Sequence, residues 1–397
     1  MEDLHLDCET LERFLADDLT PEEDRSLQRH VFTCARCEER LVALLSLGES
    51  ALPGSFRAEE DPGHREVIRT VVEEKRQSAG RLQEDLALER AEAASRWRDL
   101  EGLGQEERRN LVWNDPRYQT WGFFELLADL CHDILVQEPR KAEDVARLAL
   151  DVAEQLSPAR YGSPAVEAAK ARAWTHLANA LRVVSDFRQA EQAFLTAELH
   201  LSRSWLDPLD EALLLEFRAP LRRAQGRFEE ALEMLDTAIA IYREVNEPHL
   251  HGRVLLIKGV TFHYQGNLEA AAECYRHGLF LIDRMREPRL VVSARNNLVL
   301  SLHESGRSAE AALLLPEARQ LVEREGKRPD LLRLEWVAGR VLTALERWEE
   351  AEQAYTQVRE GFAEEGLAFD AALASLDLAA LLARLGRSAE VKRLAAE

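Results

Sequence analysis

The sequence holds few of the residues that cross-link, kink or interrupt a polypeptide chain. Its 397 residues include only 5 Cys, 13 Pro and 19 Gly. Five cysteines, three of them within the first 37 residues, do not supply a disulfide framework for a chain of this length. The scarcity of Pro and Gly leaves long stretches free to form helices, so we expect an all-α protein.

A long apolar run is also missing. The most apolar candidate, Phe123–Val136, is interrupted by Glu125, Asp129, His132 and Asp133. No segment therefore qualifies as a membrane span. The N-terminus has neither the basic start nor the apolar stretch of a signal peptide, so we expect a cytoplasmic location.

Basic residues are outnumbered. The chain carries 51 Lys and Arg against 72 Asp and Glu, which gives a net charge of −21. Phosphate backbones repel such a chain, so no direct binding of nucleic acid is expected. The first 50 residues hold 13 acidic and 5 basic side chains, a net charge of −8, and this acidic head is suited to covering a basic surface on a partner.

Three of the few cysteines lie beside a histidine in a pattern typical of metal binding. Cys8 precedes the compact run His30-x3-Cys34-x2-Cys37. Three thiolates and one imidazole match the tetrahedral ligand set of Zn²⁺. The predicted short helices at 10–18, at 21–33 and after Cys37 bury little surface, so a structural zinc ion is expected to hold them together. His5 is an alternative fourth ligand, but Cys8 is preferred because a thiolate binds zinc more strongly.

These four ligand positions, with the phrase LTPEE before the His-bearing helix, resemble the zinc-associated anti-sigma domain of bacterial anti-sigma factors. The resemblance covers residues 1–48. It implies a small helical domain that binds a sigma factor and blocks its docking on the core of RNA polymerase. Many members of that family continue into a transmembrane helix, and this sequence has none.

Residues 49–118 read as a linker followed by a charged helix. The helix is predicted over about 64–100, and we consider a division at Gly80. It has a narrow apolar stripe that includes Leu82, Ala93 and Trp97. Such a stripe suits a partner helix or a coiled coil, but packing against the segment that follows is the preferred interpretation.

Residues 119–397 are periodic. Each unit has a turn position, which falls at Ser185, Gly226, Gly266, Gly306, Glu346 and Gly386. The intervals are 41, 40, 40, 40 and 40 residues, which indicates an array of repeated helix–turn–helix units. Five residues after each turn comes a small residue, and in most units a bulky residue follows four positions later, as in Ala271 and Tyr275. These two positions are expected to pack the helix pairs against each other.

The array resembles tetratricopeptide repeats, with Trp174, Leu177 and Ala178 in a first helix and Gly259 and Gly339 at the close-contact position of later units. A degenerate unit at Trp121–Leu156 brings the expected number to about seven. The resemblance implies a right-handed α-solenoid with a concave binding face. An insert at 157–164 breaks the phase, and the short last helix is expected to fray or to continue in a longer natural chain.

The sequence lacks the motifs of common enzymes: it has no GxxxxGK[ST], HExxH or GxSxG, and no GxGxxG after a strand. We therefore expect no catalytic activity. Cys131 and Cys274 are interpreted as core residues, and His132 as a surface residue rather than a metal ligand. Five polar residues on first helices are candidates for contact with a partner: Arg172, Asn179, Arg182, Asn296 and Asn297.

The sequence thus predicts an adaptor that regulates transcription. Its zinc head would bind a sigma factor, and its repeat array would bind a second protein or peptide. Two alternatives stay open. In one, the protein is a general scaffold whose zinc is purely structural. In the other, the zinc thiolates oxidise and release the metal, so that the head is a thiol-redox switch.

Overall fold

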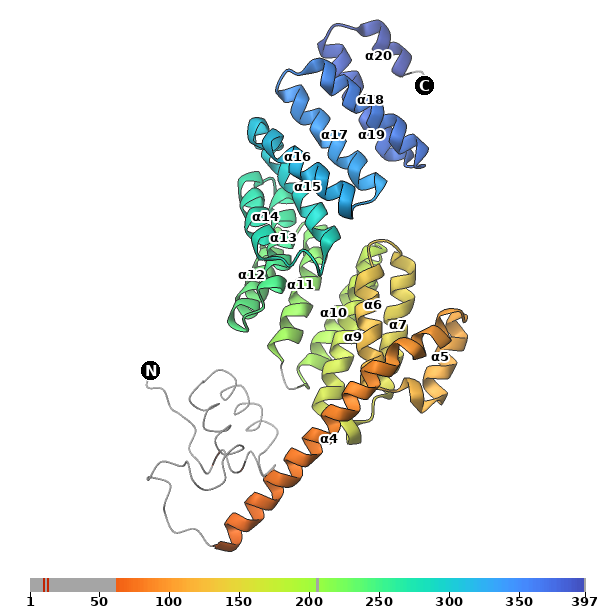
Figure 1. Ribbon diagram of the computed structural model, residues 1–397, viewed down its shortest axis with the longest axis vertical. Helices are drawn as coiled ribbons and strands as arrows, with labels where there is room; N and C mark the ends of the chain where they lie inside the picture. The colour runs from red at the N-terminus through yellow and green to blue at the C-terminus, as the bar shows by residue number, and fades with distance from the viewer. Residues whose placement is uncertain (1–9, 11–12, 14–61, 205–206, 396–397) are drawn as a thin grey trace, which may run out of the picture. The chain divides into compact units, whose positions relative to one another are not determined.

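The computed structural model describes residues 62–204 and 207–395, together with positions 10 and 13. All secondary-structure elements of this described part are helical (Figure 1). The chain divides into two compact units, residues 1–214 and 215–397, and the boundary falls inside helix α11 (Pro208–Ala224). The low content of Pro and Gly is reflected in helices of up to 40 residues.

From residue 62 onward, the first unit contains a long helix, three shorter helical segments and two helix pairs. Its elements are α4 (Pro62–Glu101), α5 (Gln105–Asn114), the 3₁₀ turn η2 (Pro116–Tyr118), α6 (Trp121–Ile134), α7 (Pro139–Gln155), α8 (Pro158–Tyr161), α9 (Ser163–Val183) and α10 (Phe187–Leu201). The pair α6/α7 corresponds to the predicted degenerate unit. The short helix α8 occupies the predicted insert and ends at Gly162, where φ is +87°.

Helix α4 packs against the repeats, as preferred from the sequence. It runs without interruption through Gly80, so the considered division there was wrong. Its Glu89 is buried and accepts hydrogen bonds from the Tyr161 hydroxyl at 2.8 Å and from the backbone N–H of Gly122 at 3.2 Å. A Cβ at Gly122 would lie 2.5 Å from the backbone of α4, so only glycine permits this approach of α4 to α6.

The second unit continues the same helix–turn–helix plan. After the rest of α11 come α12 (Phe228–Glu244), α13 (Pro248–Gln265), α14 (Leu268–Leu281), α15 (Pro288–Glu304), α16 (Ser308–Glu325), α17 (Arg328–Ala344), α18 (Trp348–Glu364), α19 (Ala368–Arg384) and α20 (Ser388–Leu394). From α6/α7 to α19/α20 the described residues form seven helix pairs, the number expected from the sequence. The last helix, α20, buries none of its residues.

The turn between the two helices of a pair has a left-handed residue at the predicted position. All six predicted positions have positive φ, between +61° at Glu346 and +86° at Gly266. Glycine adopts this conformation without steric cost, whereas Ser185 and Glu346 adopt it at a cost of roughly 1 kcal/mol or more. The 40-residue phase thus located the turns correctly, and the structure adds that their turn residue is left-handed even where it is not glycine.

The predicted small and bulky positions form the core between helices. The small residue of the second helix is completely buried in five pairs, namely Ala190, Ala231, Ala271, Ala311 and Ala351. The bulky residues Tyr275 and Tyr355 are buried one turn later. A Cβ at Gly259 or Gly339 would lie 2.7 Å from the ring of the corresponding tyrosine, which confirms these glycines as close-contact positions.

Candidate functional site

The first helices of the second unit share a stripe of side chains that, apart from the buried Leu256, keep at least part of their surface exposed. The stripe uses positions spaced i, i+4, i+7 and i+8, which share one side of a helix. We call it the first-helix face, and its members are Leu256, Val260, His263 and Tyr264 in α13, Asn296, Leu300, His303 and Glu304 in α15, and Trp336, Arg340, Thr343 and Ala344 in α17. All of them except Leu256 are at least partly exposed. Because α15 contacts both α13 and α17, the three stripes are adjacent.

In α17 the face presents a stacked tryptophan and arginine. The Arg340 guanidinium lies 4.7 Å from the centre of the Trp336 ring. The Trp336 Nε1–H and the Arg340 Nε–H both donate to Oδ2 of Asp377 in α19, each at 2.7 Å. This arrangement fixes the orientation of both side chains while leaving them partly exposed, which is typical of a preorganised surface.

Two histidines of the face are hydrogen-bonded to serines. Nδ1 of His263 lies 3.1 Å from the Ser301 hydroxyl, and Nδ1 of His303 lies 3.0 Å from the Ser308 hydroxyl. Burial lowers the pKa of His303; the charges of Glu304 and Asp377 oppose this shift, and the charge of Arg340 adds to it. His303 is therefore held toward its neutral form.

Beside α13 the face continues onto α11 through Arg223. Its guanidinium carbon lies 5.4 Å from the centre of the Tyr264 ring, and this ring is 68% exposed. Below it, Asn297 hydrogen-bonds the hydroxyl of the buried Tyr275. The sequence analysis did not single out Arg223, Tyr264, Trp336 or Arg340. Aligning the first helices at their 40-residue interval would have shown that these residues lie on the same side of successive helices.

A second polar group of this unit is interior. Arg253 of α13 donates to both carboxylate oxygens of Glu216 in α11, from Nε at 2.6 Å and from Nη2 at 2.9 Å. Its Nη1 lies 3.4 Å from Glu287, which also lies 3.0 Å from Nε2 of His249. The backbone N–H of Asp283 donates to His249 Nδ1, so Nε2 carries the proton that faces Glu287. Burial opposes the charge on Arg253, but Glu216 overcomes it and raises the pKa. This network holds α11, α13 and the start of α15 together.

The structure places three of the predicted partner-binding residues on α9 of the first unit. Arg172 forms an ion pair with Asp210 at 2.8 Å, and Asp210 is buried. Asn179 is buried and accepts hydrogen bonds from Arg182, from Nε at 3.0 Å and from Nη2 at 2.8 Å. All three side chains take part in internal contacts, and their role in binding stays a prediction.

The other two predicted residues, Asn296 and Asn297, lie on α15 of the second unit and are not brought together with the first three. The Asn296 Oδ1 is buried and has no hydrogen-bond partner among the described residues. The four predicted zinc ligands, Cys8, His30, Cys34 and Cys37, lie outside the residues that the structure describes, as does the alternative His5.

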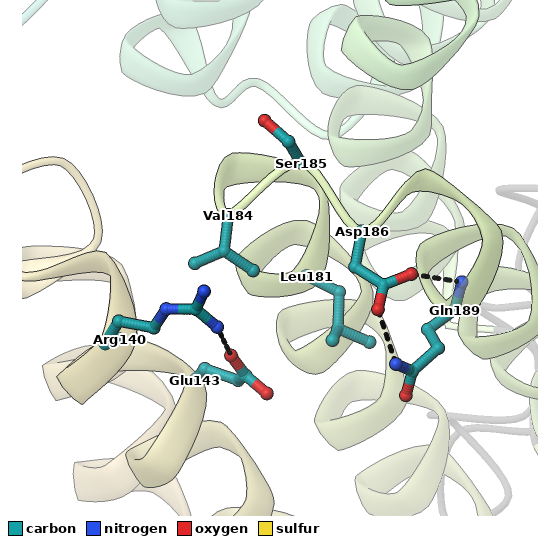
Figure 2. Close-up of a pocket in the computed structure, with 7 residues that line it drawn as sticks. All are labelled: Arg140, Glu143, Leu181, Val184, Ser185, Asp186 and Gln189. Atoms are coloured by element: carbon teal, nitrogen blue, oxygen red, sulfur yellow. Dashed lines mark hydrogen bonds and ion pairs between the residues drawn. The ribbon is translucent and has the colours of Figure 1, made fainter.

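A small polar cavity of about 340 Å³ lies in the first unit at the turn between α9 and α10 (Figure 2). Its charged groups are paired locally: Arg140 with Glu143 at 3.5 Å, and Asp186 with the backbone N–H of Gln189 at 3.0 Å. Few apolar side chains line it. It therefore lacks the apolar lining and convergent polar groups of a small-molecule site.

Burial disfavours the reactive thiolate form of the two described cysteines. Burial raises the pKa of Cys131 to about 12 and that of Cys274 to about 11. Cys131 is 1% exposed, as predicted for a core residue, whereas Cys274 is only partly buried. Within 62–204 and 207–395, no group of three or more His, Cys, Asp and Glu is arranged to hold a metal ion. Nor does any helix in these ranges combine the length and apolarity needed to cross a bilayer.

Comparison with known proteins finds one matching repeat family and several similar folds. A tetratricopeptide repeat model matches residues 210–279. Among solved structures, a Rap protein complexed with competence and sporulation factor is 13% identical with a TM-score of 0.52, over 68% of this chain and 74% of that chain. A STAND-family signal transduction ATPase with a tetratricopeptide repeat sensor from Pyrococcus horikoshii is 14% identical with a TM-score of 0.51, over 96% of this chain and 70% of that chain.

No curated protein matches the chain. The two structural similarities, at these identities, concern the fold. They agree with the 40-residue phase, the left-handed turns and the contacts of glycine with tyrosine. This chain contains a tetratricopeptide-type repeat array.

Proposed function

We propose that this protein is a non-enzymatic adaptor whose repeat array binds a segment of a partner protein along the first-helix face. The observation that carries the proposal is the contrast between the two sides of the first helices. One side is filled by contacts such as that between Gly259 and Tyr275. The other presents oriented but partly exposed groups, including Tyr264, Trp336 and Arg340. Repeat arrays of this type use such extended faces for binding.

Two matched variants test this proposal. Leu300 lies on the first-helix face, whereas Leu313 is 80% exposed on the second helix α16. Partners that co-purify with the full chain are expected to be lost on Leu300→Asp and kept on Leu313→Asp, with thermal unfolding confirming that both variants fold. Equal retention by both variants would contradict binding at this face.

We further propose that the N-terminal residues 1–48 bind one structural Zn²⁺ and a sigma factor, so that the adaptor regulates transcription in the bacterial cytoplasm. The supporting observation is the donor set. Three thiolates and one imidazole, from Cys8, His30, Cys34 and Cys37, suit zinc rather than magnesium or calcium. The net charge of −8 over the first 50 residues supports binding to a basic protein surface.

The full chain and its Cys34→Ser/Cys37→Ser variant test the second proposal. The wild-type chain is expected to hold one zinc and to bind a purified sigma factor in a salt-sensitive manner, and the variant to lose both properties. If zinc is present and no sigma factor binds, the zinc is structural only and the protein is a general scaffold. Release of zinc by mild peroxide would instead favour the thiol-redox switch.

A further inference from the structure

Arg223 stands out among the partly buried arginines of the second unit because its charge has no carboxylate partner among the described residues. It is the last-turn residue of α11, three positions before Gly226. It is partly buried, and no carboxylate of the described residues lies within ion-pair distance of its guanidinium. Burial lowers its pKa, opposed only by the hydroxyls of Tyr264 and Tyr275. Such a cation loses hydration without receiving a counter-charge.

Comparable arginines nearby are compensated. Arg253 has Glu216, Arg340 has Asp377 at 2.7 Å, and Arg295 has Glu317 at 2.7 Å. The fold therefore supplies a carboxylate at each of these three sites. At Arg223 the counter-charge has to come from outside the described residues or the cost of burial remains.

The surroundings of Arg223 suit an external carboxylate. The same repeat position, three residues before the turn, holds His263 and His303 in the next two units, and Thr343 and Ala383 in the last two. The negative end of each helix dipole explains a basic residue in these last turns, but it does not explain why Arg223 lacks a partner. Tyr264, stacked on Arg223 and largely exposed, adds apolar surface next to the charge.

We propose that Arg223 and Tyr264 form a subsite for the carboxylate of an Asp or Glu side chain in the partner segment bound on the first-helix face. The inference rests on the proposed function of that face. Arginine binds carboxylates through two parallel N–H···O bonds, and partial burial strengthens them. A single acidic side chain is favoured over a polyanion because the chain has a net charge of −21.

The test is selection of peptides from a random dodecapeptide display library by the full chain. Peptides selected by the wild type are expected to share an acidic residue at a fixed position. Arg223→Gln is expected to abolish this preference and to weaken the selected peptides roughly tenfold or more, because the charge-assisted hydrogen bonds to the carboxylate are lost. Tyr264→Leu is expected to weaken them less.

Arg284, an exposed residue in the turn before α15, provides the control. Arg284→Gln makes the same change in net charge and is expected to leave affinity and preference unaltered. Selected peptides without an acidic preference, or with one that survives Arg223→Gln, would overturn the subsite while leaving the binding face in place. If the wild-type chain selects no peptide, the proposed function itself fails, and the subsite with it.

Discussion

Arg253 and Arg223 are two partly buried cations of the same unit with opposite environments. Arg253 is held by both oxygens of Glu216 and by Glu287, so its pKa is raised. Arg223 has an aromatic ring and no carboxylate, so its pKa is lowered. The difference assigns a structural role to Arg253 and leaves Arg223 as the candidate for binding a ligand. The compensated charge of Arg253 holds helices together, whereas the uncompensated charge of Arg223 is the basis for the carboxylate subsite proposed above.

The largest effect is expected from breaking the compensated site. Glu216→Gln leaves the Arg253 guanidinium buried with only the more distant Glu287, so we expect the array to lose about 3 kcal/mol or more of unfolding free energy. Hydrogen exchange of the α13 amides measures this loss. Glu335→Gln, which breaks the exposed pair with Arg319, serves as the control and is expected to cost less than about 1 kcal/mol.

A smaller loss is expected from disturbing the packing beneath Arg223. Gly259→Ala places a Cβ 2.7 Å from the ring of Tyr275, which is buried. We expect it to cost about 1–3 kcal/mol, measured by chemical denaturation. In Gly80→Ala no atom lies within 4 Å of the new Cβ, so this change is expected to stabilise the long helix α4 by about 0.5–1 kcal/mol. Equal effects at the two glycines would contradict the close packing of α13 on α14.

Removal of the uncompensated charge is expected to have little effect on stability. Arg223→Gln eliminates a partly buried charge that no described carboxylate balances, so the unfolding free energy should stay within about 1 kcal/mol of wild type or increase. Arg253→Gln should instead destabilise strongly, because it leaves Glu216 buried and unpaired. A large loss on Arg223→Gln in thermal unfolding would show that Arg223 has a structural counter-ion after all.

The smallest effect concerns pH. Burial lowers the pKa of His303 in the folded state, so at mildly acidic pH the unfolded state binds more protons than the folded one. The contribution of His303 to the free energy of unfolding is therefore complete above its unfolded pKa of about 6.5. It is lost as the pH falls toward the lowered pKa of the folded state. His303→Gln should flatten the pH dependence of the melting temperature between about pH 5 and 7. An unchanged slope would contradict this assignment.

Much of the array could be predicted from the sequence because its determinants are local and periodic. The phase located turns at Ser185 and Glu346, where the residue type alone would not. It also identified Gly259 and Gly339 by spacing, and their contacts with tyrosine rings explain why.

The site was harder to predict because it depends on contacts between distant residues. Glu89 of α4 is joined to Tyr161 of the insert, and no local pattern links the two. Arg223 is notable because no described carboxylate forms an ion pair with it. That absence depends on how the neighbouring helices pack, which the sequence does not show. The predicted Arg172 and Asn179 have the expected chemistry for binding, but their contacts are internal.

Site-specific photo-cross-linking tests the central claim most directly. Tyr264 and Phe280 are both exposed aromatic residues of the second unit, 68% and 84% exposed, but Tyr264 lies on the first-helix face and Phe280 near the end of the second helix α14. The photoreactive p-benzoylphenylalanine can replace either without disturbing the core. A partner protein cross-linked from position 264 and not from position 280 is the predicted result. Cross-linking from position 280 alone would contradict binding on the first-helix face.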